Sequence, residues 1–434
     1  MGKREIRLKY GEGEIAFSLP EEQIFFEVYG KEYPAVADIP GAIRAALDKP
    51  IDSPPLRELL RPTDKVAITV SDITRSWQRM DLVLPSLFET IAQAGIPDEN
   101  VSILVVVGGH RQNTREEMEL LCGREVCRRV NVVNHNARDL SNMVYLGKTS
   151  RGTEVSINRV VAEADRIILT GGIIYHYMVG YGGGRKSVIP GFSSIRTIQQ
   201  NHLWAMAPEL GQGSNPNARC GKTRGNECHE DMMEIAGFIK PDFIVNVVPN
   251  AEGDYAGIFA GNWVSAWQEG TRLVDEIYGV EIPALADIVI ASAGGSPKDI
   301  NLYQAGKTMD FASYAVKKGG AVIVVSECPD ILEPPEFPQW FQYPSTLEME
   351  KALRADFTIP GWVAFKEVEC SDLATYIMVT RPENAELVGK AGIIPVTTME
   401  AALAEAYRRC GTEDPRIMLM PQGANTLPVL KAKS

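Results

Sequence analysis

The sequence lacks the long apolar segments of membrane proteins and secreted precursors. No apolar run reaches the roughly 18 residues that a membrane-spanning helix requires. The first residues, MGKREIRLKYGEGEIAF, contain no apolar core of the kind that a signal peptide needs. We therefore expect a soluble, cytoplasmic protein with no membrane partner.

Cysteine is sparse, and its spacing excludes the usual cysteine-based sites. The cysteines form no CxxC pair, and an odd number in a chain of 434 residues favours reduced thiols over disulfides. The spacing of Cys122 and Cys127 is not that of a zinc site, so we expect these two thiols to be incidental. The seven positions are Cys122, Cys127, Cys220, Cys228, Cys328, Cys370 and Cys410.

Basic residues are outnumbered by acidic ones, 44 to 56, which gives a formal net charge of −12. A nucleic-acid-binding protein would present a basic face or stripe, so this balance argues against a nucleic-acid partner. An anionic ligand would have to be held by a local group of arginines and lysines. Such groups are therefore informative in this chain.

The composition that remains, 45% hydrophobic and 23% charged, is that of a globular protein, and the length favours at least two domains. Short β-branched runs are followed by a turn and then by a helical pattern, which predicts an α/β fold with mostly parallel sheets flanked by helices. The expected strands are Val66–Val70, Ile103–Val107, Arg166–Thr170, Phe243–Val248, Asp287–Ala291, Ala321–Val325 and Ile417–Met420. The expected helices are Leu82–Ala94, Arg115–Leu121, Trp263–Tyr278, Thr308–Lys317 and Met399–Arg409.

A domain boundary is expected around Gly279–Asp287, where a helical pattern ends and Pro283 precedes a new strand. This predicts an N-terminal α/β domain over residues 1–278 and a C-terminal α/β domain over residues 279–408. The last segment, 409–434, is expected to pack back on the N-terminal domain. Residues Pro329–Tyr343, rich in proline and aromatic residues, predict an irregular surface or cleft-edge loop.

Polar clusters follow three of the expected strands, at Asp72–Arg75, Gly108–Arg111 and Gly171–His176. Ligands of parallel sheets bind beyond the carboxyl ends of the strands, so these clusters point to a site. Asp72 and Thr74 could equally cap the next helix. Arg75 is a candidate for binding a carboxylate or phosphate through two hydrogen bonds.

The densest signal is the segment Gly171–Gly191, in which seven of 21 residues are glycine. Gly182–Gly184 followed by Arg185 and Lys186 offers backbone N–H groups and two cations, a setting suited to a phosphate. The P-loop pattern G-x-x-x-x-G-K-[ST] fails only because Arg185 stands where it requires glycine. A nucleotide-binding loop and a purely structural glycine turn both remain open on local composition.

Histidine is the second signal, because all five histidines lie between residues 110 and 229. His110 and His176 follow strands and Gly-Gly turns, so both should face the same strand-end region. Two imidazoles there suit chemistry that removes a proton on one face and returns it on the other. The alternative is that each is an ordinary hydrogen-bonded loop histidine. His229 is expected at a helix start rather than as a ligand.

Taken together, these residues resemble the nickel-dependent lactate racemase family. The matching segments spread over most of the chain in consistent order, and the long glycine segment is the most specific of them. They are SDITR (Ser71–Arg75), GGHRQNTREE (Gly108–Glu117), HYMVGYGGGRKSVIPG (His176–Gly191), NH (Asn201-His202), SPKDINLYQAGK (Ser296–Lys307) and PQGANTLP (Pro421–Pro428).

The resemblance implies two α/β domains with the active site in the interdomain cleft. It implies a nickel-pincer nucleotide, pyridinium-3,5-bisthiocarboxylate mononucleotide carrying nickel, bound covalently through Lys186, with His202 coordinating the nickel. His110 and His176 take the acid/base roles. Asp72, Ile73, Thr74, Arg75, Gln304 and Lys307 correspond to cofactor-binding positions, and Arg75, Tyr303 and Lys307 to substrate-binding positions.

The chemistry that the resemblance implies is racemisation of a 2-hydroxy acid by proton-coupled hydride transfer. One histidine removes the hydroxyl proton, a planar 2-keto acid forms, and the other histidine returns a proton on the opposite face. Arg75 and Lys307 would hold the carboxylate. Imidazole suits nickel, and a lysine must be neutral to attack a carbonyl, which burial and the neighbouring Arg185 would favour. Proteins that make and insert the cofactor are implied partners.

The match thins after Ala321, and Trp362 has no clear counterpart in the family pattern. Lactate and larger 2-hydroxy acids, such as a sugar acid or an aryl-hydroxy acid, therefore stay open as substrates. Two other functions stay open: a nucleotide-dependent transferase or kinase built on the glycine loop, and a non-catalytic protein that carries the cofactor. The sequence does not predict the oligomeric state.

Overall fold

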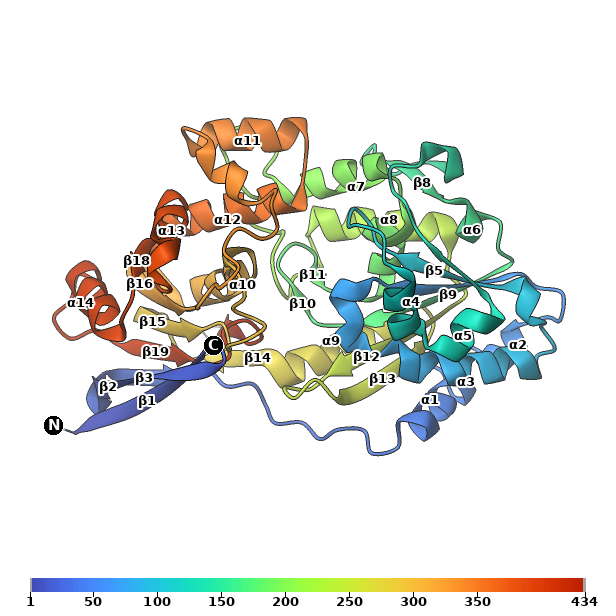
Figure 1. Cartoon of the computed structure of the whole chain (residues 1–434), viewed down its shortest axis with the longest axis horizontal. Helices are drawn as coiled ribbons and strands as arrows, with labels where there is room; N and C mark the ends of the chain where they lie inside the picture. The colour runs from blue at the N-terminus through green and yellow to red at the C-terminus, as the bar shows by residue number, and fades with distance from the viewer. Residues whose placement is uncertain (1, 432–434) are drawn as a thin grey trace. The chain divides into compact units, whose positions relative to one another are not determined.

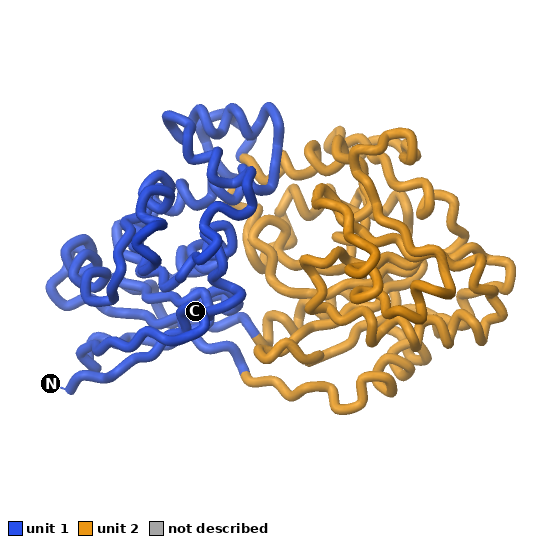
Figure 2. Tube along the Cα trace, in the orientation of Figure 1, with its two compact units in different colours: residues 1–31, 207–214, 278–434 blue, residues 32–206, 215–277 orange. Residues whose placement is uncertain are grey.

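The computed structural model describes residues 2–431, which form a mixed α/β structure with two compact units. Figure 2 colours the two units separately. Unit 1 comprises the chain up to residue 31, residues 207–214 and the chain from residue 278 onward, and unit 2 comprises residues 32–206 and 215–277. Each unit has its own large sheet and its own apolar core.

Unit 2 is built on a six-stranded sheet in the order β13-β12-β9-β4-β5-β6, parallel except that β13 is antiparallel to β12. The central strands are nearly continuous apolar runs, as is typical of parallel strands covered on both faces. The strands are β4 (Val66–Ser71), β5 (Val101–Val106), β6 (Asn131–Asn134), β9 (Arg166–Gly172), β12 (Phe243–Pro249) and β13 (Tyr255–Gly261). Two hairpins accompany the sheet, β7–β8 (Met143–Lys148, Glu154–Asn158) and β10–β11 (Tyr175–His176, Gly180–Tyr181).

Helices cover both faces of this sheet, with α1 and α3 on one side and α7 and α8 on the other (Figure 1). Helix α3 buries Val83, Leu84, Leu87 and Ile91, a helical spacing that gives one apolar stripe toward the core. The helices are α1 (Ile39–Asp48), α2 (Leu56–Leu59), α3 (Met80–Gln93), α4 (Arg115–Cys122), α5 (Arg124–Arg129), α6 (Arg159–Ala162), α7 (Ile195–His202), α8 (Glu227–Ile239) and α9 (Ser265–Tyr278).

The sheet of unit 1 also has six strands, in the order β18-β17-β16-β15-β19-β3, and every neighbouring pair is parallel. The strands are β3 (Ile24–Glu27), β15 (Ala286–Ser292), β16 (Val316–Val325), β17 (Thr375–Val379), β18 (Ile394–Val396) and β19 (Ile417–Met420), with two smaller pairs, β1–β2 (Lys3–Tyr10, Gly13–Pro20) and β14–β20 (Gly279–Ile282, Leu427–Leu430). The helices are α10 (Leu302–Ser313), α11 (Thr346–Ala355), α12 (Ile359–Leu373), α13 (Ala385–Lys390) and α14 (Met399–Arg409).

The α/β class and the parallel sheets expected from the sequence are confirmed, and each expected strand is present with bounds shifted by a few residues. One expected helix is displaced. Helix α10 begins at Leu302 rather than Thr308, because the Asn301 side chain caps it by accepting from the backbone N–H of Gln304 at 2.9 Å. The irregular segment at 329–343 is present, but Phe337 within it is fully buried rather than exposed.

The expected domain bounds differ from the compact units at both ends of the chain. Residues up to 31 belong to unit 1, because β3 pairs with β19 and the β1–β2 hairpin buries Leu8 and Leu19 in the core of that unit. The last described segment also belongs to unit 1, where β19 pairs on one side with β3 of the expected N-terminal domain. Its strand β19 is an apolar run paired with β15, and β20 pairs with β14.

Residues 207–214 belong to unit 1 although the segments before and after them belong to unit 2. Three side chains of α11 and α12 hold this segment. Arg354 donates to the carbonyl of Ala207 at 2.7 Å, Glu350 accepts from the backbone N–H of Gly211 at 3.0 Å, and Glu369 accepts from that of Ser214 at 2.7 Å. None of the helices among residues 2–431 has the length and apolar character needed to traverse a bilayer.

Leu419 lies at 1% exposure in the core of unit 1, whereas Leu332 of the same unit is 63% exposed. We expect Leu419→Ala to lower the free energy of unfolding by about 2–5 kcal/mol, because it leaves a cavity in a packed sheet, and Leu332→Ala to lower it by less than about 0.5 kcal/mol. Urea unfolding measures both. Equal losses in the two variants would contradict the assigned core.

Candidate functional site

The loops of the candidate site follow adjacent strands of unit 2. Strands β9, β4 and β5 are neighbours in the sheet, so the segments after their carboxyl ends, at 72–75, 108–111 and 173–176, lie at the same edge. After β4 the chain adds β5 and then β6 on one side of it. It then crosses to the other side of β4 and adds β9 and β12 there. The order therefore reverses between β4 and β9, which is where open α/β sheets bind ligands.

Asp72 binds and orients His110. One carboxylate oxygen of Asp72 contacts Nδ1 of His110 at 2.8 Å, and the other accepts from the backbone N–H of Thr74 at 2.8 Å. Burial by itself raises the pKa of this carboxyl, but the hydrogen bonds from His110 and Thr74 and the charge of Arg75 outweigh it and lower the pKa below its usual value. An ionised Asp72 therefore fixes Nδ1 of His110 as a proton donor and leaves Nε2 to act on a ligand.

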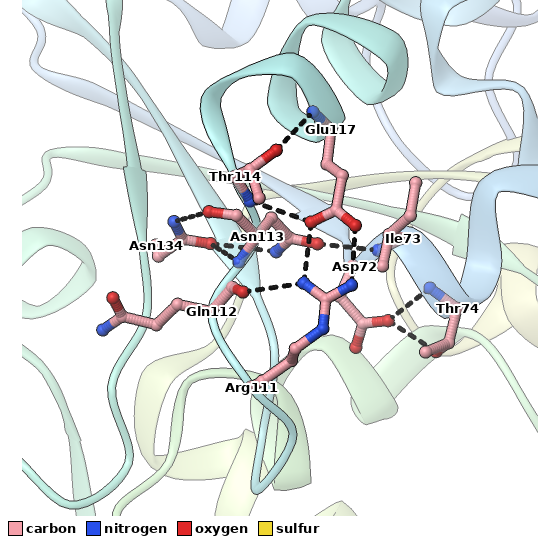
Figure 3. Close-up of polar contacts among 9 residues, drawn as sticks. All are labelled: Asp72, Ile73, Thr74, Arg111, Gln112, Asn113, Thr114, Glu117 and Asn134. Atoms are coloured by element: carbon pink, nitrogen blue, oxygen red, sulfur yellow. Dashed lines mark hydrogen bonds and ion pairs between the residues drawn. The ribbon is translucent and has the colours of Figure 1, made fainter.

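The loop that carries His110 is held by its own side chains (Figure 3). Arg111 donates two hydrogen bonds to Glu117, at 2.8 and 2.6 Å, and Glu117 forms a capping box with Thr114 at the start of α4. Asn113 accepts from the backbone N–H of Ile73 at 2.9 Å and so joins this loop to the loop after β4. These residues of the GGHRQNTREE motif are structural, and they fix the position of His110.

His176 and Lys186 are in direct contact, with Nε2 of His176 2.6 Å from Nζ of Lys186. The other ring nitrogen, Nδ1, accepts from the backbone N–H groups of Met178 and Val179 at 3.2 and 3.4 Å. A neutral imidazole carries one proton, which must then be on Nε2 and be donated to Lys186. An ammonium has no lone pair to accept it, so this geometry requires a neutral amine at Lys186.

The surroundings of Lys186 favour the same state. Burial is the largest cause that lowers the pKa of Lys186 to about 7, followed by the positive charges of Arg75 and Arg185. Burial, Lys186 and both arginines also hold the pKa of His176 well below its ordinary value. Near neutral pH a substantial fraction of Lys186 is therefore the neutral amine, the form that can act as a nucleophile, and His176 is a neutral imidazole.

His202 ends helix α7 and is 2% exposed. Its Nδ1 lies 2.8 Å from the carbonyl oxygen of Ile198, so Nδ1 carries the proton and the lone pair is on Nε2. Burial, then the charge of Lys186, lowers the pKa of His202 to about 3. A neutral imidazole with its tautomer fixed by a backbone carbonyl is the form that binds a metal ion.

Arg75 connects these groups electrostatically. Its guanidinium donates to the carbonyl of Thr74 at 3.1 Å, and the side chain is exposed. Its charge acts on Asp72 as well as on His176 and Lys186, so the two parts of the site lie within reach of one cation. Arg75 is thus placed to bind an anionic group beside both histidines.

Arg185, by contrast, is not available to a phosphate, which corrects one expectation from the sequence. It is 1% exposed, and its guanidinium donates to the carbonyls of Val179 and Tyr181 at 2.8 and 2.9 Å. The glycine run leads into a 3-10 turn, Gly184–Ser187, and a short π-helix, Val188–Phe192, rather than into an α-helix. The helix N-terminus that a P-loop uses to bind phosphate is therefore absent from this segment, which argues against the kinase alternative.

The remaining two histidines are structural. His135 is fully buried, with Nε2 2.9 Å from the carbonyl of Ser193 and Nδ1 3.1 Å from the amide of Asn158. Burial lowers the pKa of His135 to about 4. His229 lies in the first turn of α8, as expected, and its ring stacks on that of Trp267.

The second set of predicted site residues lies in unit 1. Tyr303, Gln304 and Lys307 occupy the first turns of α10, which follows the carboxyl end of β15. Lys307 donates to the side chain of Gln304 at 2.6 Å. Their roles in binding cofactor and substrate stay predictions.

Two side chains that hold the glycine segment were not among the residues expected from the sequence. The side chain of Asn246 accepts from the backbone N–H of Gly184 at 2.9 Å, and the indole of Trp267 donates to the carbonyl of Gly182 at 2.8 Å. The sequence contained one sign that Asn246 has a partner. An asparagine interrupts the apolar run of β12, and it would be costly to bury without a partner.

Comparison with known proteins places this chain among isomerases. Residues 10–213 match the family model for the lactate racemase N-terminal domain, and residues 282–427 match that for the lactate racemase C-terminal domain. The lactate racemase of Thermoanaerobacterium thermosaccharolyticum is 32% identical over 97% of this chain and 98% of its own length. That of Lactiplantibacillus plantarum is 32% identical over 89% of this chain and 90% of its own length.

Solved structures agree with these matches. The lactate racemase apoprotein from T. thermosaccharolyticum superposes with a TM-score of 0.89 and 31% identity, covering 98% of this chain and 100% of that one. A protein from Thermotoga maritima, 19% identical with a TM-score of 0.65, shares the fold alone. The chain belongs to the lactate racemase family.

The lowered pKa of Lys186 predicts a pH dependence of stability. Between about pH 7 and pH 10 the unfolded chain binds a proton at this lysine that the folded chain does not, so its contribution to stability rises with pH. We compare the free energy of unfolding of the wild type with that of Lys186→Met. The difference, wild type minus variant, should become more positive as the pH is raised from about 7 to about 9. Urea unfolding of both proteins tests this, and a difference that does not vary with pH would contradict a neutral Lys186.

Proposed function

We propose that this chain inverts the stereocentre of a 2-hydroxy acid, lactate or a larger relative, with a nickel-pincer nucleotide bound through Lys186. The observation that carries the proposal is the contact between His176 and Lys186, which requires a neutral amine. A neutral, partly buried lysine is a nucleophile available to form a covalent bond. Membership of the lactate racemase family supports the same activity.

The residues present fit the cofactor. Lys186 would form the covalent link, and His202 would bind nickel through Nε2, whose lone pair is defined by the bond from Nδ1 to Ile198. When bound, the cofactor supplies a pyridinium ring that accepts and returns the hydride of the substrate carbon. Thr74 and Arg75, beside Asp72 and Ile73 in the loop after β4, would bind its phosphate or the substrate carboxylate.

The chain's own residues supply the proton transfers. His110, with Nδ1 held by the ionised Asp72, would remove or return the hydroxyl proton through Nε2. His176, protonated on Nε2, would return the proton to the planar 2-keto acid, and it would act as the base for the opposite enantiomer in the tautomer that carries its proton on Nδ1. With Lys186 bound to the cofactor, its amine would no longer accept from Nε2 of His176, and that nitrogen would be available to the substrate. Arg75 would hold the carboxylate while the planar 2-keto acid forms and accepts a proton from the second histidine.

The partners that follow are a small hydroxy acid and the proteins that make and insert the cofactor. Co-expression with those proteins should add the mass of the nucleotide to the wild type, and Lys186→Ala should abolish the adduct completely. Lys65→Ala, which alters an exposed lysine of the same unit, should retain it. Intact-mass spectrometry measures all three, and an adduct on Lys186→Ala would contradict the anchor.

The acid/base roles predict that His110→Ala and His176→Ala each lower kcat at least about 100-fold while the covalent adduct still forms. Gln112→Ala, beside His110 on the same exposed loop, serves as the control and should retain activity. Circular dichroism follows inversion across a panel of 2-hydroxy acids labelled with deuterium at Cα. Retention of the label supports hydride transfer. Exchange of the label with solvent would falsify that step.

A further inference from the structure

The segment that carries His176 and Lys186 has little regular structure of its own. Strands β10 and β11 are two residues each, and the glycine run between β11 and Lys186 is followed by a 3-10 turn and a short π-helix. Two groups 10 residues apart are nevertheless held 2.6 Å from each other. Helix α9 of the same unit supplies two side chains that contact this segment at separate points.

Trp267 is the first of these side chains and is 3% exposed. Its Nε1–H donates to the carbonyl of Gly182 at 2.8 Å. Gly184 has a φ of +55°, and a β-carbon there would lie only 2.7 Å from Cδ1 of Trp267, so the backbone passes directly against the indole. The glycine run is therefore shaped to fit this tryptophan.

The indole also supports Arg185, the residue next to Lys186. The guanidinium carbon of Arg185 lies 4.4 Å from the centre of the Trp267 ring, within the range of a cation–π contact. Arg185 in turn binds the carbonyls of Val179 and Tyr181 at 2.8 and 2.9 Å, and burial lowers the pKa of this arginine to about 9. One tryptophan thus holds the glycine run both directly and through a buried cation.

Asp275 is the second side chain, eight residues further along α9. Its carboxylate accepts from the hydroxyls of Tyr175 and Tyr181 at 2.8 and 2.7 Å. These tyrosines are paired across β10 and β11, in the register that also pairs His176 with Gly180. Asp275 therefore fixes the hairpin at the residue next to His176.

We propose that Trp267 and Asp275 are positioning residues that hold His176 and Lys186 in register for the reaction proposed above. The inference rests on that proposed function. Trp267 acts on the Lys186 end of the segment and Asp275 on the His176 end, and both belong to helix α9. A misplacement of about 1 Å at reacting groups can cost about 100-fold in rate, so loosening either contact should lower kcat with little effect on KM.

The first test uses the chain without cofactor. Trp267→Phe keeps a six-membered aromatic ring but removes the pyrrole ring, and with it the donor to Gly182 and the Cδ1 atom that packs against Gly184. Hydrogen exchange of peptides covering residues 180–186 should become about 5- to 100-fold faster. Trp263→Phe makes the same change just before α9 and should leave exchange unchanged. Asp275→Ala should accelerate exchange around residues 175–181. Asp275→Asn should restore slow exchange, because one amide oxygen can still accept from both tyrosines.

The second test separates positioning from a general structural role. Trp267→Phe should weaken the pH dependence of stability that belongs to Lys186, because a looser loop admits water to the amine. In the loaded enzyme Trp267→Phe and Asp275→Ala should each lower kcat about 10- to 100-fold with KM changed less than about threefold. Unchanged exchange in both variants overturns the inference, as does faster exchange with kcat and the pH dependence both unaltered. If the wild type forms no adduct and has no racemase activity, the proposed function is wrong. Hydrogen exchange and the pH dependence of stability then still test the role of α9.

Discussion

Lys186 and His176 share one hydrogen bond, and the direction of that bond determines what the site can do. Backbone N–H groups occupy Nδ1 of His176, so the ring donates from Nε2, and only an uncharged amine can accept. The neutral form requires burial and nearby positive charge, and Arg75 and Arg185 supply the charge. The glycine run, the buried arginine and helix α9 all contact the segment that brings these two nitrogens together.

A cation buried without a carboxylate is an unusual element for a protein interior, because desolvation of the guanidinium is costly. Arg185 offsets this with carbonyls of its own loop and with the face of Trp267. An acidic partner would have stabilised the arginine more, but it would also have cancelled the field that lowers the pKa of Lys186. Carbonyls and an indole leave the positive potential at the site intact, and the carbonyls accept from both terminal nitrogens of the guanidinium.

The sequence predicts most of the fold, since apolar runs such as Val66–Val70 and Ile417–Met420 mark buried parallel strands and depend only on local pattern. It also locates the three loops of the site, since polar residues gather where those strands end. The partnerships are harder to predict, because they join residues far apart in the chain. Asp72 is 38 residues from His110 and Trp267 is 85 from Gly182, and no local pattern distinguishes these contacts from a helix cap or a core tryptophan.

The path of the chain has a consequence for how this molecule can be divided. Strand β3, near the beginning of the chain, completes a sheet whose other strands come from residues 286–420, and residues 207–214 are held by α11 and α12 of the same unit. A fragment cut at residue 278 would keep β3 without its partner strand and leave unit 1 with an unpaired sheet edge. Neither fragment from a cut at residue 278 contains all the strands of the unit 1 sheet. Recombination between relatives should therefore exchange whole chains more readily than parts of the chain.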